Sequence, residues 1–306
     1  MKKTLLAVMA VLMMSVMLIA GCSSGEESAP AADKKGGATT IGFSISTLNN
    51  PFFVSVKDGV EAKAQELGVN VKIVDAQNDP AKQANDVADL IQQGVSVLLV
   101  NPVDSAAIST SVEAANKANI PVIALDRSAD KGTLASLVAS DNVKGGEMAA
   151  EYIIQKLGEA VKVAELEGIP GASATRERGE GFHKVADQKL NVVAKQSADF
   201  DRTKGLTVSE NMLQANPDIQ AIFAQNDEMA LGAIEASKSA GKQIFIVGFD
   251  GTADGLKAVE AGTMAATIAQ QPELMGQQGL EAAVKLAKGE KIEAKISVPL
   301  KLVEKK

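Results

Sequence analysis

The polar side chains best suited to bind a ligand follow short apolar runs of this chain, at the point where each run ends. Residues 122–127 (VIALDR), 221–227 (AIFAQND) and 244–251 (IFIVGFDG) all pass from an apolar run to charged or amide side chains. Residues 40–46 (TIGFSIS) lead into a TLNNPFF motif, and residues 265–270 (AATIAQ) end on an amide. Ligands of open parallel sheets bind outside the carboxyl ends of the strands. The pattern therefore predicts a small-molecule site at that edge of a sheet.

The residue types in this set favour a sugar as the ligand. Asn, Asp, Arg and Gln side chains together offer donors and acceptors, and a sugar hydroxyl both donates and accepts a hydrogen bond. Only 3% of the residues are aromatic, yet Phe52 and Phe53 are adjacent, shortly after the first apolar run. Because the C–H faces of a sugar ring pack well on aromatic faces, two phenyl groups beside polar side chains indicate a monosaccharide pocket.

Sequence features typical of an enzyme are missing. The chain contains no G-x-G-x-x-G, G-x-x-x-x-G-K-[ST] or H-E-x-x-H motif, and it has one Cys and one His. Asp126 and Asp250 could form the carboxylate pair of a glycosidase, but two sugar contacts explain them more simply. We expect His183 to be a solvent-facing helix residue without a role in metal binding or base catalysis. The sequence thus predicts a binding protein that needs no cofactor and no metal.

The elements that position these residues alternate between strands and helices. Short runs rich in Val, Ile and Leu alternate with longer segments of helical period, which is typical of βαβ units and a parallel sheet. One helix is expected from Pro51 to Leu67, with Gly68 ending it, and the next from Asp79 to Gly94. The ten expected strands are residues 40–46, 71–75, 97–100, 122–125, 134–139, 162–167, 192–195, 221–224, 245–249 and 266–269. The final apolar run, residues 296–303, is an eleventh strand or an extended closing segment.

Length and charge limit the classes of protein that this chain can be. Its 306 residues suffice for about two domains, and ten strands fit two doubly wound domains better than one. The net charge of −7 disfavours a nucleic-acid partner, because phosphate binding depends on clustered Lys and Arg. Beyond the amino-terminal region, no run is long and apolar enough to cross a membrane.

The amino-terminal region predicts export and a lipid anchor. Two lysines precede an apolar stretch at residues 5–18, and Cys22 follows small residues in the sequence LIAGC. This arrangement is typical of a secretory signal peptide, here residues 1–21, rather than a spanning helix. It resembles a bacterial lipobox, in which Cys22 becomes the diacylated first residue of the mature chain; an unmodified cysteine at this place is the alternative. Residues 22–39 are rich in Gly, Ser, Ala and charge, so we expect a flexible linker.

Nine linked motifs extend from about residue 40 to the carboxyl end of the chain. They are STLNNPFF, VNPVDS, IPVIALDR, ASDNVKGG, TRERGEGF, SADFDRTKGL, FAQNDEMALGA, VGFDGTADG and ATIAQ. In this order and spacing they closely resemble the ribose-binding proteins of bacterial ABC sugar importers, in the type I periplasmic-binding-protein family. The resemblance implies an α/β fold of two similar lobes, each a parallel sheet flanked by helices, joined by a three-segment hinge. It implies an amino-terminal lobe at residues 40–140 plus 271–299, and a carboxyl-terminal lobe at 141–270 plus 300–306.

The resemblance also implies which side chains contact the sugar. Those of the amino-terminal lobe are Asn50, Phe52, Phe53, Asp126 and Arg127. Those of the carboxyl-terminal lobe are Arg178, Phe200, Asn226, Asp250 and Gln270. In this family pattern the phenylalanines flank the sugar ring, the other side chains bind its hydroxyls, and closure of the lobes excludes water. The stretch 183–198 is one residue shorter than in a ribose-binding member of the family, which leaves the placement of Phe200 open.

For function, the resemblance implies capture of D-ribose outside the cytoplasm and its delivery to an ABC permease with an ATPase partner. It leaves a chemoreceptor partner open, and it implies that the protein acts as a monomer. The ligand could instead be allose, galactose, xylose or a furanose-like signalling molecule, because small loop changes alter the specificity of a pocket. A sugar-responsive repressor shares the core fold, but it would carry a helix-turn-helix in place of the signal peptide and Cys22.

Overall fold

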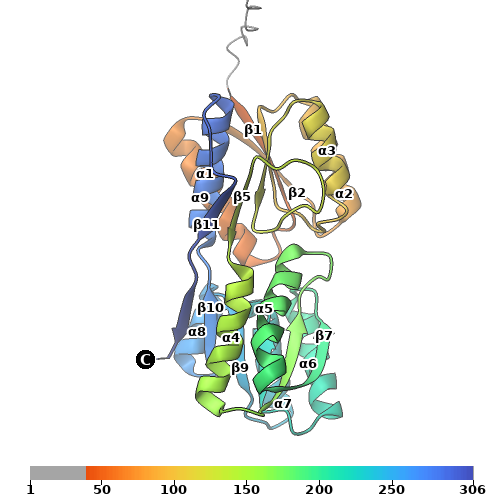
Figure 1. Cartoon of the computed structure of the whole chain (residues 1–306), viewed down its shortest axis with the longest axis vertical. Helices are drawn as coiled ribbons and strands as arrows, with labels where there is room; N and C mark the ends of the chain where they lie inside the picture. Colours follow the sequence, from red (N-terminus) through yellow and green to blue (C-terminus); the bar gives the residue numbers. More distant parts are fainter. Residues whose placement is uncertain (1–38, 306) are drawn as a thin grey trace, which may run out of the picture. The chain divides into compact units, whose positions relative to one another are not determined.

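The structure, a computed structural model, describes residues 39–305 (Figure 1). The predicted signal peptide (1–21), Cys22 and all but the last residue of the predicted linker (22–39) lie outside the described residues. The described part contains twelve strands and nine helices, which alternate along most of its length. They form two lobes, each built on a six-stranded sheet.

The first lobe is a sheet with the strand order β11-β5-β4-β3-β1-β2, in which every adjacent pair is parallel. Its strands are β1 (Thr40–Ile45), β2 (Asn70–Asp75), β3 (Val97–Val100), β4 (Val122–Leu125), β5 (Ser136–Ser140) and β11 (Lys295–Val298). Its helices are α1 (Pro51–Leu67), α2 (Pro80–Gln92), α3 (Ser109–Lys117) and α9 (Pro272–Ala287). The order β2-β1-β3-β4-β5 is that of a flavodoxin-like doubly wound sheet.

The second lobe repeats this arrangement with the strand order β12-β10-β9-β8-β6-β7. Its strands are β6 (Lys162–Glu167), β7 (Asn191–Ser197), β8 (Ala221–Ala224), β9 (Phe245–Asp250), β10 (Ala266–Ala269) and β12 (Lys301–Glu304). Its helices are α4 (Asn142–Leu157), α5 (Ser173–Lys189), α6 (Arg202–Ala215), α7 (Asp227–Ser239) and α8 (Ala253–Ala261). β12 is antiparallel to β10, and the other pairs are parallel. Two similar parallel sheets flanked by helices confirm the predicted fold class.

The chain passes between the two lobes three times. It does so between β5 and α4, between β10 and α9, and between β11 and β12. These connections correspond to the three-segment hinge that the family resemblance implies. The boundaries at 140/141, 270/271 and 299/300 rest on that resemblance and stay predictions.

Residues 296–303 are two strands and not the single eleventh strand considered from the sequence. β11 ends at Val298 in the first sheet, and β12 begins at Lys301 in the second. Pro299 lies between them, and proline lacks the N–H that a continuous strand would use for pairing. The segment therefore adds one short strand to each lobe.

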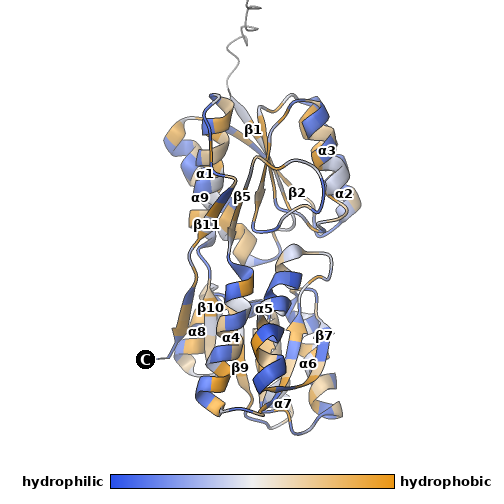
Figure 2. Ribbon diagram, in the orientation of Figure 1, coloured by the Kyte–Doolittle hydropathy of each residue, from blue (hydrophilic) through white to orange (hydrophobic). Residues whose placement is uncertain are grey.

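The inner strands of each sheet are buried because helices cover both faces of the sheet. All four residues of β3 are at most 1% exposed, and Phe43, Phe182, Phe223 and Phe249 are among the largest fully buried side chains. In Figure 2 the hydrophobic colour concentrates on the strands, and the helices carry hydrophilic stripes. Strands that are covered on both faces read as continuous apolar runs, which is why the sequence pattern could predict them.

The first helix begins and ends as its sequence predicts. Asn50 caps α1, because its side-chain oxygen accepts a hydrogen bond from the Phe52 N–H (2.9 Å), and Pro51 follows as the first helical residue. Gly68 ends the helix with a φ of 65°, a conformation that favours glycine. Asp79 caps α2 in the same way as Asn50 caps α1.

Glycines allow α4 and α5 to pack closely. Gly146 lies against the carbonyl of Arg178 and Gly181 against the carbonyl of Val143, and a Cβ at either glycine would overlap the opposing oxygen. The close approach fixes the position of α5, which carries Arg178. The ASDNVKGG and TRERGEGF motifs therefore belong to a helix pair that positions this arginine.

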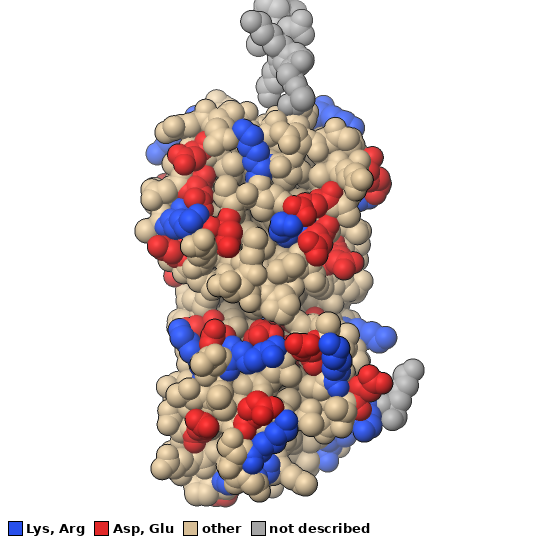
Figure 3. Space-filling view, turned by 180° about the vertical axis from the view of Figure 1, so that it is seen from behind, with Lys and Arg blue, Asp and Glu red and all other residues tan. Residues whose placement is uncertain are grey.

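The surface carries charges of both signs. Figure 3 shows Lys and Arg interspersed with Asp and Glu over one face, without a large area of a single sign. Among residues 39–305, no helix combines the length and hydropathy needed to cross a bilayer. Within the same residues, no three His, Cys, Asp or Glu side chains are grouped so that they could hold a metal ion.

Candidate ligand-binding site

A small cavity is lined by residues of both lobes. Its lining consists of Asn50, Phe52, Phe53, Asp126, Arg127, Ala174, Arg178, Phe200, Asn226 and Asp250. Nine of these residues were expected from the family resemblance. The tenth expected residue, Gln270, donates from Nε2 to Asp250 Oδ1 (2.9 Å) and so lies beside a residue of the lining. The structure thus brings all ten side chains together, and their contact with a sugar stays a prediction.

Asp126 follows β4 and faces the cavity through an uncommon backbone conformation. Its φ is 64°, a region that residues other than glycine seldom adopt. Asn101 Nδ2 donates to the carbonyl of Leu125 (3.0 Å) and to Asp126 Oδ2 at the long distance of 3.5 Å. Because buried contacts hold this conformation, the carboxylate is oriented before any ligand binds.

Arg127 is buried beside Asp126 and lies between aromatic rings from both lobes. Its Nε lies 3.4 Å from Asp126 Oδ2, and its Nη1 donates to the carbonyl of Pro102 (3.0 Å). Its Cζ lies 4.9 Å from the ring centroid of Phe53 in the first lobe and 5.2 Å from that of Phe200 in the second. At these distances the rings attract the cation. The guanidinium therefore connects the two lobes.

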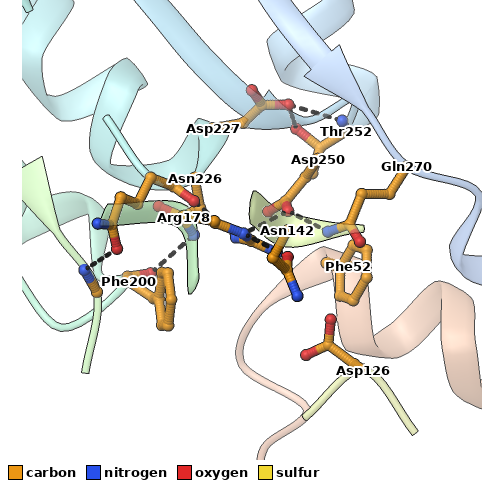
Figure 4. Close-up of polar contacts among 12 residues, drawn as sticks. Phe52, Asp126, Asn142, Arg178, Phe200, Asn226, Asp227, Asp250, Thr252 and Gln270 are labelled. Atoms are coloured by element: carbon orange, nitrogen blue, oxygen red, sulfur yellow. Dashed lines mark hydrogen bonds and ion pairs between the residues drawn. The ribbon is translucent and has the colours of Figure 1, made fainter. Parts of the chain in front are cut away.

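Arg178 is the corresponding guanidinium of the second lobe. Its Nε donates to Asn142 Oδ1 (2.9 Å), and its Nη1 donates to the carbonyl of Gln225 (2.7 Å). The same Nη1 lies 3.7 Å from Asp250 Oδ1, and Cζ lies 3.9 Å from the ring centroid of Phe249. These contacts, several of which Figure 4 shows, hold the guanidinium beside the Asp250 carboxylate at the end of β9.

Phe200 and Asn226 complete the second-lobe side of the cavity. Phe200 lies in the loop between β7 and α6 with a φ of 60°, and its ring packs on Gly168 so closely that a Cβ there would overlap it. Asn226 caps α7 by accepting a hydrogen bond from the Met229 N–H (2.9 Å), and its Nδ2 donates to the carbonyl of Phe200 (3.2 Å). The shorter stretch before this loop therefore does not remove Phe200 from the cavity.

Burial and the two guanidinium groups act in opposite directions on the carboxylates of the site. Burial raises the pKa of Asp126, while Arg127 and Arg178 act to lower it. Burial also raises the pKa of Asp250 well above its usual range; Arg178 acts against this shift, and the nearby Asp227 adds to it. A ligand that donates hydrogen bonds to these carboxylates favours their charged forms. Two carboxylates and two guanidinium groups thus compensate one another in a closed cavity.

Three buried polar atoms of the site have no hydrogen-bond partner within the described structure. They are Asp126 Oδ1, Arg127 Nε and Gln270 Oε1. The 3.4 Å approach of Arg127 Nε to Asp126 Oδ2 is an ion pair but not a well-formed hydrogen bond. Buried polar groups are nearly always paired, because leaving one unpaired costs about 1 to 3 kcal/mol. Two acceptors and one donor are therefore placed to pair with groups that both donate and accept.

Four polar residues that support the site were not predicted from the sequence. Asn142 and Gln225 bind Arg178, Asn101 binds the end of β4, and Asp227 binds the turn after β9. Most of their partners are more than twenty residues away in sequence, so local spacing does not reveal the pairs. Two of the four could have been found from the sequence, because Asn101 and Gln225 each follow directly after an apolar strand, β3 and β8.

His183 is not the solvent-facing residue expected from the sequence. Its side chain is 24% exposed, with Nε2 2.9 Å from Glu165 Oε2 and Nδ1 2.7 Å from Asp187 Oδ1. Glu165 is fully buried in β6, and its other oxygen accepts a hydrogen bond from Gln225 Nε2 (2.8 Å). The hydrogen bond to Glu165, together with that to Asp187, raises the pKa of His183 to about 9 despite the opposing effect of burial. The histidine thus compensates a buried carboxylate behind the site.

Comparison with known families decides which class of protein uses this arrangement. Residues 41–291 match the sequence profile of the periplasmic binding protein domain. The chain belongs to this family. Members are substrate-binding proteins of ABC transporters and not enzymes.

Individual periplasmic binding proteins show how close the similarity is. The ribose import binding protein RbsB of Bacillus subtilis (strain 168) is 59% identical over 302 residues, which cover 98% of this chain and 99% of that protein. The protein of the same name from Escherichia coli (strain K12) is 58% identical over 268 residues, 87% of this chain and 90% of that protein. A solved ABC transporter periplasmic solute-binding protein from Actinobacillus succinogenes 130z with bound D-allose has a TM-score of 0.82 and 31% identity. The two structures match over 87% of this chain and 97% of the Actinobacillus chain.

Proposed function

We propose that this protein captures D-ribose in the cavity between its lobes and delivers it to an ABC importer. The observation that carries the proposal is the set of unpaired buried atoms Asp126 Oδ1, Arg127 Nε and Gln270 Oε1. A pentose presents neighbouring hydroxyls that each donate and accept, so one sugar can pair with all three atoms. Because these atoms belong to both lobes, a sugar bound to them stabilises the closed arrangement.

The aromatic side chains of the cavity support a ring-shaped ligand. Phe52 and Phe53 lie edge to face, with ring centroids 5.2 Å apart, and Phe200 lies in the opposite lobe. Phenyl faces on both sides suit the C–H faces of a sugar, while its hydroxyls point to the polar side chains. We propose as sugar contacts Asn50, Phe52, Phe53, Asp126, Arg127, Arg178, Phe200, Asn226, Asp250 and Gln270.

Allose, galactose, xylose or a furanose-like signalling molecule are the alternative ligands. The similarity to ribose import binding proteins over nearly the whole chain supports ribose. One methylene changes affinity by only about 1 to 3 kcal/mol, so the choice of sugar has to be measured.

The mature protein is proposed to be held at the outer face of the cell membrane by lipid on Cys22. Membership of the periplasmic binding protein family implies export. The lipobox-like sequence LIAGC and the linker that follows it support the anchor. Two acyl chains on one cysteine would give stable attachment, whereas a single chain binds reversibly.

The proposed partners are a membrane permease and its ATPase, to which the closed, loaded form docks. A chemoreceptor as a further partner stays open. We propose that the protein acts as a monomer without cofactor, metal or nucleic acid. Both lobes contact the sugar in this proposal, so the importer can distinguish the loaded form by its closure.

Calorimetric titration of the mature protein with D-ribose tests the proposal. We expect one-to-one binding, with allose, galactose and xylose as weaker competitors and with the sugar recovered unaltered. A response only to another sugar would keep the fold and change the ligand. Chemically altered sugar would contradict the assignment to a binding protein.

A further inference from the structure

Asp227 is a fully buried carboxylate directly behind the cavity, outside its lining. It is the first residue of α7 and follows Asn226. Its Oδ2 accepts hydrogen bonds from the N–H (2.7 Å) and the hydroxyl (3.0 Å) of Thr252, and its Oδ1 accepts one from the Thr267 hydroxyl (2.7 Å). One carboxylate therefore ties α7 and β10 to the turn that follows β9. Figure 4 shows its contact with Thr252.

The turn that Asp227 holds begins with Asp250, which has a strained backbone. The φ of Asp250 is 119°, and residues other than glycine keep such a conformation only where surrounding contacts maintain it. The next residue, Gly251, has a φ of 75° and donates its N–H to Thr267 Oγ1 (3.3 Å). Asp227 thus binds Thr252 directly and Gly251 through Thr267. Both residues that follow Asp250 are fixed in this way.

Two glycines, Gly248 and Gly255, leave space for the Asp227 carboxylate. A Cβ at Gly248 or at Gly255 would overlap an oxygen of Asp227. The carboxylate is also not needed to cap α7, because Asn226 already does so. Burying a charged group is costly unless it is well hydrogen-bonded, and Asp227 meets that condition with donors from two elements. Its position is therefore better explained by the turn that it holds than by helix capping.

On the other side of the turn, the Asp250 carboxylate takes part in the polar surroundings of the cavity. Its Oδ1 accepts a hydrogen bond from Gln270 Nε2 (2.9 Å) and lies 3.7 Å from Arg178 Nη1. A small rotation of the strained backbone would move this oxygen away from both partners. The direction of the carboxylate thus depends on the anchoring of the turn.

We infer that Asp227 is a positioning residue for ligand binding, which holds the turn from Asp250 to Thr252 so that the Asp250 carboxylate faces the sugar beside Arg178. The inference rests on the proposed function, because a sugar is the ligand that Asp250 contacts there. Asp227 itself touches no ligand and acts through Asp250.

Calorimetric titration with D-ribose of Asp227→Ala, Asp250→Ala and the double variant tests this role. Asp227→Ala is expected to bind ribose about tenfold or more weakly, because the Asp250 carboxylate no longer points toward the sugar hydroxyl that donates to it. In the Asp250→Ala background, Asp227→Ala is expected to weaken ribose binding by less than about threefold, because Asp227 acts through Asp250. If the double variant loses as much binding free energy as the two single variants together, the positioning role is overturned.

Further variants separate positioning from a general effect on folding. Asp227→Asn keeps an oxygen for Thr252, and we expect its affinity to return to within about threefold of the wild type. Asp254→Ala removes an exposed carboxylate from α8 and is expected to leave affinity unchanged. If circular dichroism shows that Asp227→Ala is unfolded, Thr267→Val takes its place, with the same predicted dependence on Asp250.

The outcomes distinguish this inference from the proposed function. Wild-type protein that binds no ribose would overturn the proposed function and the inference with it. Wild-type binding together with unaltered affinity in folded Asp227→Ala would overturn the inference alone. Weak binding by Asp227→Asn and Asp227→Ala alike would show that charge, and not anchoring of the turn, is what matters, and would also overturn it.

Discussion

Arg127 of the first lobe and Phe200 of the second are in direct contact, with 5.2 Å between the guanidinium carbon and the ring centroid. The same guanidinium lies 4.9 Å from the ring of Phe53. One buried cation is thus placed between a ring from each lobe. Because this contact requires the lobes to be close together, it connects closure with the geometry of the site.

Replacing Phe200 by leucine is expected to weaken ribose binding by about 1 to 2 kcal/mol, or about 5- to 30-fold. The change removes the ring from Arg127 and from the sugar but keeps an apolar side chain near Gly168. Titration calorimetry measures the effect. Phe245→Leu is the matched control, because that ring packs on Tyr152 in the second lobe and does not line the cavity. Equal affinities of the two variants would remove Phe200 from the site.

Asp126→Ala is expected to weaken ribose binding by at least about 1.5 kcal/mol, the low end for a hydrogen bond to a charged group. The substitution removes the unpaired acceptor Oδ1 and also leaves the buried Arg127 without its carboxylate. Asp58→Ala serves as a control, since that side chain is 59% exposed and pairs with Lys57 within α1 of the same lobe. Calorimetric affinity equal to the wild type would exclude Asp126 as a contact.

His183 is expected to make folding stability depend on pH. Its pKa of about 9 lies above the usual 6.5, so the charged form contributes its full stabilisation below pH 6.5 and loses it as the pH rises through about 9. We expect a loss of about 1 kcal/mol, a modest value because the side chain is partly exposed. Urea unfolding of the wild type and of His183→Gln on both sides of this range measures the contribution. The same pH dependence in both proteins would contradict it.

Cys22→Ala is expected to release the protein from membranes. The lipobox interpretation makes Cys22 the acylated residue, and the chain has no other cysteine. Fractionation of cells that express each form measures the distribution between membrane and soluble fractions. If the variant still sediments with membranes, another part of the chain holds it there.

The positions of the site residues could be predicted because parallel strands end at one edge of a sheet. The polar residues after β4, β8 and β9 were visible in the sequence as abrupt ends of apolar runs, and Asp126, Asn226 and Asp250 indeed line one cavity. The uninterrupted apolar runs predicted the strands well for the same physical reason, burial on both faces. The assignment of each half of the cavity to a lobe came from the family resemblance, because periodicity does not show that a chain passes between lobes.

The supporting contacts could not be predicted from local patterns. His183 was expected in solvent, but its partner Glu165 lies in β6, 18 residues earlier in the sequence, and only the fold brings the two together. Asp227 has the sequence signature of a helix start, and its contacts to Thr252 and Thr267 span 25 and 40 residues. The split at Pro299 was not predicted either, although a proline argues against a continuous strand.

A crystal structure of the mature protein with D-ribose tests the central claim most directly. The account predicts one sugar between the lobes, with its hydroxyls in hydrogen-bond contact with Asp126 Oδ1, Arg127 Nε and Gln270 Oε1 and its ring between Phe52, Phe53 and Phe200. Ribose at another place, or in the cavity with these three atoms still unpaired, would contradict it.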